Sequence, residues 1–255
     1  MNLRMNPHCA SGYKSASQIT RKITEAWADA NMFCVACESP SLASAGVNAE
    51  AIDFKCTSCH AVYQLKALKS WSERRVPDAG YDAMMRALRS DSIPNLLIMQ
   101  YTPEWVVHNL VLIPSFFFSP AAIQKRKPLS PNARRAGWVG CNILISEIAS
   151  DGKIRMVSQG TPLPPDTVRM RYNLVRPLSQ IATNTRGWML DVLRVVRKMG
   201  KTRFSLADVY AFERVLSDIY PKNKNVRPKI RQQLQLLRDL GYISFEGQGQ
   251  YLLLK

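Results

Sequence analysis

Four cysteines fall into two closely spaced pairs, Cys34 with Cys37 and, eighteen residues later, Cys56 with Cys59. Each Cys-x-x-Cys turn can direct two thiolates at one ion, and two such turns at this separation are typical of a tetrahedral four-cysteine zinc site. Four protein ligands fill the coordination shell, so we expect the Zn²⁺ to be structural rather than catalytic. The alternative, two redox-active dithiols, lacks the βαβ context of a thioredoxin-like fold.

Three polar side chains flank the second cysteine pair: Asp53, Gln64 and Lys66. Alternating apolar residues around them predict two strands joined through the cysteine turn. Gln64 and Lys66 are two apart and share a strand face, and Asp53 approaches both if the strands pair. An Asp carboxylate and a second oxygen ligand can hold Mg²⁺ or Mn²⁺, while a lysine positions the attacking water, which is the chemistry of the Asp…(Asp/Glu)-x-Lys nucleases. The plainer alternative is an exposed edge strand.

The charge of the chain favours a polyanionic partner. Its 255 residues carry a formal net charge of +16, and the sequence pI is near 9.9. Nucleic acid fits such an excess, although a merely basic soluble protein would also show it. Hydrophobic residues make up 46% of the chain, enough for a packed core in one large or two ordinary domains.

No segment predicts export or membrane insertion. Residues 1–14 lack the apolar core of a signal peptide, and the most apolar stretch, residues 105–123, is interrupted by histidine, asparagine and prolines. We therefore expect a cytoplasmic protein without a membrane partner. In a reducing compartment, cysteines are metal ligands or free thiols more often than disulfides.

The pattern of the chain changes between residues 176 and 187, which predicts a domain boundary near 183 and domains at 1–183 and 184–255. Strand-like apolar runs precede it, at 95–101, 106–113 and 137–145. Three amphipathic helices and a hairpin follow it, with 14 Lys or Arg against 6 Asp or Glu. This order predicts a winged helix whose third helix enters the major groove of DNA. A small helical packing domain is the alternative.

Long segments of the chain resemble the DpnI-like methyladenine-dependent restriction endonucleases. The resemblance is carried by both cysteine pairs, by Asp53 and the Leu65-Lys66 pair, and by residues 78–91, 124–143 and 229–239. It implies a mixed α/β PD-(D/E)xK nuclease core with a zinc site, followed by a winged helix. It further implies a type II (type IIM) enzyme that uses Mg²⁺ or Mn²⁺, needs no small-molecule cofactor, and cuts both strands of GATC sites bearing N6-methyladenine. Both domains of such enzymes read the methylated site.

Two groups of residues are candidates for contacting this DNA. A basic run without acidic residues suits phosphate contacts, and Trp138 beside it offers an apolar wall for the N6-methyl group, although a place in the core is its alternative. On the third C-terminal helix, Arg and Gln side chains suit guanine and adenine edges, but adjacent helical residues point about 100° apart, so the sequence does not select among them. The candidates are Lys125, Arg126, Lys127, Arg134, Arg135 and Trp138, then Arg231, Gln232 and Gln233.

One departure from the resemblance concerns Gln64, where the related enzymes have Glu. Gln keeps a carbonyl oxygen for the metal but loses a charge, so we expect weaker Mg²⁺ binding. Other nucleases, similar to the Mrr restriction enzymes, use a Gln-x-Lys. The second hypothesis is a methyladenine-specific DNA-binding protein that no longer cuts. A third, a zinc-ribbon transcription factor, leaves residues 105–180 unexplained. The sequence leaves open whether the chain acts as a monomer and where it cuts.

Overall fold

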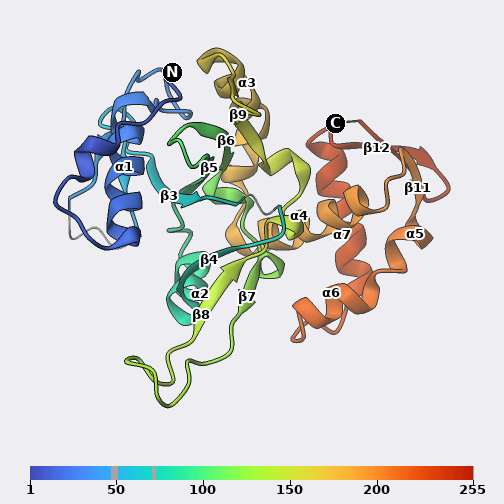
Figure 1. Ribbon diagram of the computed structural model, residues 1–255. Helices are drawn as coiled ribbons and strands as arrows, with labels where there is room; N and C mark the ends of the chain where they lie inside the picture. Colours follow the sequence, from blue (N-terminus) through green and yellow to red (C-terminus); the bar gives the residue numbers. More distant parts are fainter. Residues whose placement is uncertain (47–50, 71–72, 255) are drawn as a thin grey trace. The chain divides into compact units, whose positions relative to one another are not determined.

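The computed structural model describes residues 1–46, 51–70 and 73–254 (Figure 1). The chain divides into two compact units, each built from several segments. Unit 1 comprises Met1–Val76, Ser92–Ser115 and Asp151–Gln180, and unit 2 comprises Pro77–Asp91, Phe116–Ser150 and Ile181–Lys255. Residues 77–91 and 116–150 therefore cluster with the C-terminal segment, while the predicted boundary near residue 183 stays a prediction.

A mixed sheet forms the centre of unit 1. In the described residues it has seven strands in the order β1-β2-β3-β5-β6-β9-β10, with β3 and β5 parallel and the other neighbouring pairs antiparallel. The strands are β1 Ala43–Ser44, β2 Phe54–Lys55, β3 Val62–Leu68, β5 Asn95–Tyr101, β6 Val107–Ile113, β9 Ile154–Ser158 and β10 Thr161–Pro162. The apolar runs at 95–101 and 106–113 form the buried strands β5 and β6, as their composition predicts.

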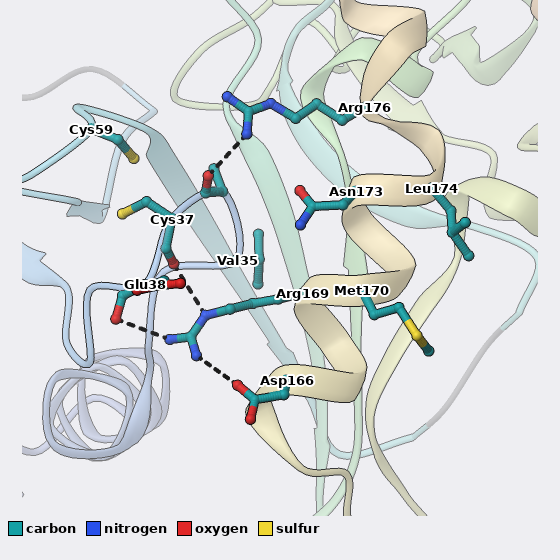
Figure 2. Close-up of a pocket in the computed structure, with 11 residues that line it drawn as sticks. Val35, Cys37, Glu38, Cys59, Asp166, Arg169, Met170, Asn173, Leu174 and Arg176 are labelled. Atoms are coloured by element: carbon teal, nitrogen blue, oxygen red, sulfur yellow. Dashed lines mark hydrogen bonds and ion pairs between the residues drawn. The ribbon is translucent and has the colours of Figure 1, made fainter.

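Two helices accompany this sheet. Helix α1 (Ala16–Asn31) buries Ile23, Thr24, Trp27 and Ala28 on one face, and the Trp27 indole nitrogen donates a hydrogen bond to the Asn2 carbonyl at 2.6 Å. Helix α3 (Pro165–Val175) flanks the loop that carries the first cysteine pair (Figure 2). Short 3₁₀ turns along the chain are η1 Pro7–Ala10, η2 Ser115–Phe117, η3 Pro120–Ala122, η4 Ile145–Glu147, η5 Ser150–Gly152 and η6 Arg176–Gln180.

The C-terminal part of unit 2 is a winged helix, as the sequence predicts. The β11-β13-β12 sheet is antiparallel, and α7 is the third of the predicted helices. The second predicted helix is divided into two by a break at Ala211 and Phe212. The elements are α4 Thr183–Lys198, β11 Arg203–Ser205, α5 Leu206–Tyr210, α6 Glu213–Ile219, α7 Val226–Asp239, β12 Ile243–Gly247 and β13 Gln250–Leu253.

A second small sheet belongs to unit 2 and has the strand order β4-β8-β7. Helix α2 follows β4 directly along the chain. These elements are β4 Val76–Gly80, α2 Tyr81–Arg89, β7 Ile123–Lys125 and β8 Gly140–Ile143. Asp191 of α4 is fully buried and accepts hydrogen bonds from the hydroxyls of Ser119 and Tyr220, each at 2.7 Å. Arg194 pairs with Glu147 and lies 3.6 Å from Asp191. This buried polar network ties segment 116–150 to the helices of the winged helix.

In the part of the chain that the structure describes, no helix combines the length and apolar composition that crossing a bilayer requires.

Candidate zinc centre, active site and DNA-contacting residues

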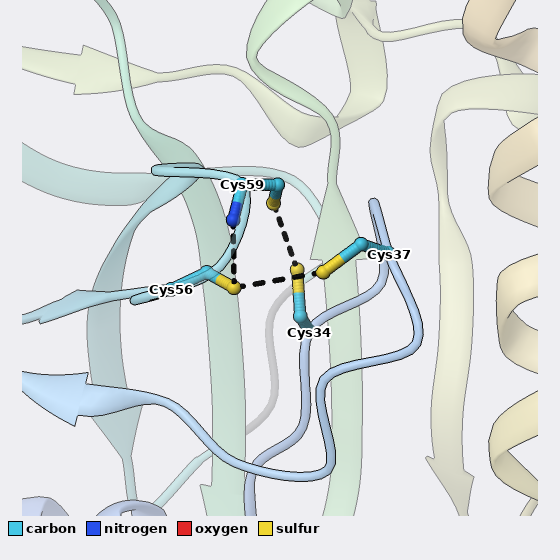
Figure 3. Close-up of side chains that lie close together, drawn as sticks. All are labelled: Cys34, Cys37, Cys56 and Cys59. Carbon is cyan, nitrogen blue, oxygen red and sulfur yellow. Dashed lines mark hydrogen bonds between the residues drawn. The ribbon is translucent and has the colours of Figure 1, made fainter.

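The four paired cysteines converge in unit 1. Cys34 and Cys37 follow α1, Cys56 and Cys59 lie between β2 and β3, and the four Sγ atoms all lie within 4.8 Å of one another (Figure 3). Sγ of Cys34 is 3.5 Å from that of Cys59, and Sγ of Cys37 is 3.6 Å from that of Cys56. Tetrahedral zinc with Zn–S bonds of about 2.3 Å needs sulfur separations of about 3.8 Å, so the cluster fits structural zinc.

Backbone amides of the second cysteine turn point at its thiols. Burial opposes ionisation of Cys56, but hydrogen bonds from the backbone N–H groups of Cys59 and Ser58 outweigh it and lower the pKa of Cys56 to about 6. The Cys34 thiol is buried beside the Tyr63 hydroxyl, at 3.2 Å, and burial raises its pKa. A bound cation favours the thiolate of every ligand, so metal binding offsets the cost of burying these charges.

The structure places Asp53 against the segment of β3 that carries Gln64 and Lys66. Strands β2 and β3 pair antiparallel, and the Asp53 backbone N–H donates to the Tyr63 carbonyl at 2.9 Å. The Asp53 carboxylate in turn accepts a hydrogen bond from the Leu65 backbone N–H at 2.7 Å. Leu65 stands between the other two residues, so the carboxylate lies against the Gln-x-Lys segment.

Strand β3 holds the other two side chains of this site. Gln64 and Lys66 pair with Leu96 and Ile98 of the buried strand β5 in parallel register. Gln64 is only 9% exposed, and Lys66 is half-buried. A carboxylate, an amide oxygen and an ammonium group are thus carried by two paired segments, and the oxygen donors suit Mg²⁺ or Mn²⁺.

The sequence did not point to helix α1 as part of this site. Burial raises the pKa of Asp53, and the charge of Glu25 raises it further, while the Leu65 N–H, Lys66 and Arg21 lower it. Glu25 and Arg21 are one helical turn apart on α1 and form an ion pair at 2.6 Å. Their spacing was visible in the sequence, but their closeness to Asp53 depends on how α1 packs. A cation beside Asp53 would keep this carboxylate ionised.

The predicted phosphate-contacting residues lie in unit 2 at and beyond the end of β7. All five basic candidates, Lys125, Arg126, Lys127, Arg134 and Arg135, are exposed. These exposed side chains lie at the end of β7 and in the segment that connects β7 to β8, where a large anionic partner could contact them.

Trp138 is half-buried in the same segment rather than enclosed in a core. The Arg135 guanidinium lies 4.7 Å from its ring centre. Two glycines make room for the indole: a Cβ added to Gly140 would lie 2.8 Å from the ring, and one added to Gly80 would lie 3.6 Å from the indole nitrogen. The ring is therefore held in place while part of it stays accessible.

On α7 the three candidate residues differ in exposure. Arg231 and Gln232 are exposed, and Arg231 donates a hydrogen bond to the Tyr210 hydroxyl at 2.8 Å. Gln233 is fully buried beside the apolar stripe of the helix, so it cannot reach a base edge in this packing. Arg227, which the sequence argument did not select, lies on the same face as Arg231, with its guanidinium 5.0 Å from the Tyr210 ring centre.

Comparison with known protein families covers nearly the whole chain. A model described as DpnI, Dam-replacing family, matches residues 1–181. A second model, described as the Dam-replacing HTH domain, matches residues 184–252.

Proposed function

Because this chain is a member of the Dam-replacing family, we propose that it is a methylation-dependent type II restriction endonuclease that cuts duplex DNA at GATC sites bearing N6-methyladenine. One observation carries the catalytic part of the proposal. The hydrogen bond from the Leu65 N–H holds the Asp53 carboxylate against the segment that carries Gln64 and Lys66, where it could bind a metal ion. The alternative, that Asp53 lies on an exposed edge strand, does not explain why its carboxylate is half-buried.

The roles of the three residues follow from their chemistry. Asp53 and Gln64 would hold Mg²⁺ or Mn²⁺, which when bound polarises the scissile phosphate and lowers the pKa of a coordinated water. Lys66 orients the attacking water and offsets the negative charge that develops on the phosphate. The Leu65 N–H keeps the Asp53 carboxylate turned toward the Gln-x-Lys segment. The Cys34, Cys37, Cys56 and Cys59 zinc site anchors the strands on either side of the second cysteine turn.

Recognition of the methylated site belongs to residues of unit 2. Methylation of adenine N6 adds an apolar group in the major groove and leaves one N–H donor. The accessible part of Trp138 suits this methyl group, and the exposed Arg231 and Gln232 suit base edges. The basic residues of the β7-β8 hairpin suit the phosphates.

The direct test uses matched plasmids with and without adenine methylation at GATC, incubated with the protein and Mg²⁺. We expect fragments from the methylated plasmid only, and no fragments with Asp53→Asn or Lys66→Ala. Equal cutting of both plasmids would refute the methylation dependence. Cutting by Asp53→Asn at the rate of the native protein would refute the proposed active site.

Gln64 favours one alternative, a methyladenine-binding protein that does not cut, since a site with one fewer carboxylate binds Mg²⁺ more weakly. The same plasmids distinguish the two. Selective retention of the methylated plasmid without any fragmentation, at high Mg²⁺ and with Mn²⁺, supports the binding protein.

A further inference from the structure

The loop that carries Cys34 and Cys37 is bound from outside by one arginine of α3. Nε of Arg169 donates to the carbonyls of Cys34 and Cys37, both at 3.1 Å, and Nη2 donates to those of Glu38 and Ser39 at 3.4 and 3.3 Å. Figure 2 shows the bonds to Cys37 and Glu38. One guanidinium thus contacts four carbonyl oxygens of a loop that contains two of the four zinc ligands.

This loop makes few backbone hydrogen bonds of its own. It has no helix or strand between Met32 and Pro40. Within it, the Cys34 N–H donates to the Ser39 carbonyl and the Val35 N–H donates to the Tyr63 hydroxyl. Carbonyl groups in the buried part of this loop, which includes Cys34, need donors, because an unpaired one costs free energy comparable to a lost hydrogen bond. Arg169 supplies those donors.

The guanidinium is itself held in place. Its side chain is 17% exposed, its carbon lies 5.1 Å from the Phe33 ring centre, and it forms an ion pair with Asp166 at 3.3 Å. Arg176, further along the chain, donates to the Ala36 carbonyl at 3.4 Å. Both arginines line the groove of about 1120 Å³ that runs beside Cys37 and Cys59.

Charge gives this arrangement a second role. Four thiolates around Zn²⁺ carry a net charge of −2, and burying that charge is costly unless positive charge lies nearby. A guanidinium is always ionised and presents several donors in one plane, which a lysine cannot do. Groups around the ligands of a metal commonly tune how tightly it is held.

We propose that Arg169 is the positioning residue of the zinc site: it fixes the first cysteine loop by its carbonyls and offsets the charge of the metal–thiolate centre. The proposal does not depend on the nuclease activity. It predicts that zinc retention, rather than general stability, is the property most sensitive to this side chain.

The test measures the rate at which zinc passes from the folded protein to a chromogenic chelator. Arg169→Gln should release zinc about tenfold faster or more, the usual effect of removing such a supporting group. Arg169→Lys, which keeps the charge but not the planar set of donors, should fall between Arg169→Gln and the native protein. Arg171→Gln, at an exposed position of the same helix, should behave like the native protein.

A second control separates zinc retention from loss of stability. Ile23→Val removes one methyl group from a fully buried side chain of α1, so it lowers stability without touching the cysteine loop. We expect zinc release from Ile23→Val at the native rate. Zinc release from Arg169→Gln that matches the native protein or Ile23→Val would overturn the proposal. If Arg169→Gln does not fold, native release from Arg169→Lys together with an unchanged thiolate-to-cobalt absorption band in its Co²⁺ form would overturn it.

Discussion

Position 64 sets how strongly the proposed catalytic site can hold a divalent cation. Gln64→Glu adds a second carboxylate next to Asp53, and affinity for Mg²⁺ rises with the charge of its ligands. We expect the Mg²⁺ concentration for half-maximal cutting to fall by on the order of tenfold. The measurement is the cutting rate of methylated plasmid against Mg²⁺ concentration.

The control for this change is Gln18→Glu, which adds the same charge at an exposed position of α1. It should leave the Mg²⁺ dependence where the native protein has it. An unchanged midpoint in Gln64→Glu would mean that position 64 does not contact the cation.

The position of the Trp138 ring depends on Gly140, which has no side chain. Gly140→Ala would bring a Cβ within 2.8 Å of two indole carbons, so the ring must move. The displaced ring would lose its contact with the N6-methyl group of adenine. Since burying a methyl group contributes about 0.8 kcal/mol, this loss should lower the preference for methylated DNA by roughly fourfold. The ratio of kcat/KM on methylated and unmethylated duplexes measures this.

Gly46→Ala is the matched control, because an added Cβ there has no neighbour within 4 Å. It should keep the native preference. If Gly140→Ala slowed cutting of both duplexes equally, Trp138 would have no part in reading the methyl group.

At the scale of elements, the features that depend on short spacing could be predicted from the sequence. The two cysteine turns converge as their spacing requires. The alternation around the second turn predicts the β2-β3 pair that brings Asp53 to Leu65. Ser205 and Asp208 form a complete capping box at the start of α5, with Asp in place of the more usual Glu.

The features that the sequence could not supply depend on packing between distant segments. Gln232 and Gln233 are adjacent and chemically identical, and only the packing of α7 exposes the first and buries the second. The place of Trp138 depends on Gly80, which lies at the end of β4, distant along the chain. Glu25 comes near Asp53 through the packing of α1, and the sequence around Glu25 does not predict this proximity.

Helix α4 carries a prediction about pH. Burial raises the pKa of Asp191 to about 6, against the lowering effect of its hydrogen bonds from Ser119 and Tyr220. Its folded pKa lies above the unfolded value, so its contribution to stability is complete below about pH 4 and is lost as the pH rises through 6. The shift of about two units corresponds to about 3 kcal/mol.

Urea unfolding of the native protein and of Asp191→Asn between pH 4 and 7 isolates this contribution. The free energy of unfolding of the native protein minus that of the variant should fall over this range and level off above it. Asp218→Asn, at an exposed position of α6, should show no such slope. A difference between native protein and Asp191→Asn that is constant with pH would contradict the assignment.

The two compact units divide the proposed activity between them. Asp53, Gln64 and Lys66 belong to unit 1, and the eight candidates for DNA contact that are exposed or half-buried, from Lys125 to Gln232, belong to unit 2. The net charge of +16 supplies attraction to any duplex, since phosphate contacts carry no sequence information. The proposed preference for methylated DNA would therefore come from the side chains of unit 2 that are candidates for reaching base edges.

It follows that recognition and cutting can be separated by a single substitution. Asp53→Asn removes a charge from the proposed metal site and leaves every candidate of unit 2 in place, so it should stop cutting while keeping the proposed preference for methylated duplex in binding. Fluorescence anisotropy with methylated and unmethylated duplexes at several salt concentrations measures both. Affinities for the two duplexes should fall with salt along parallel lines, because the same phosphates are contacted in each. If Asp53→Asn bound both duplexes equally, the metal site itself would take part in reading the methyl group.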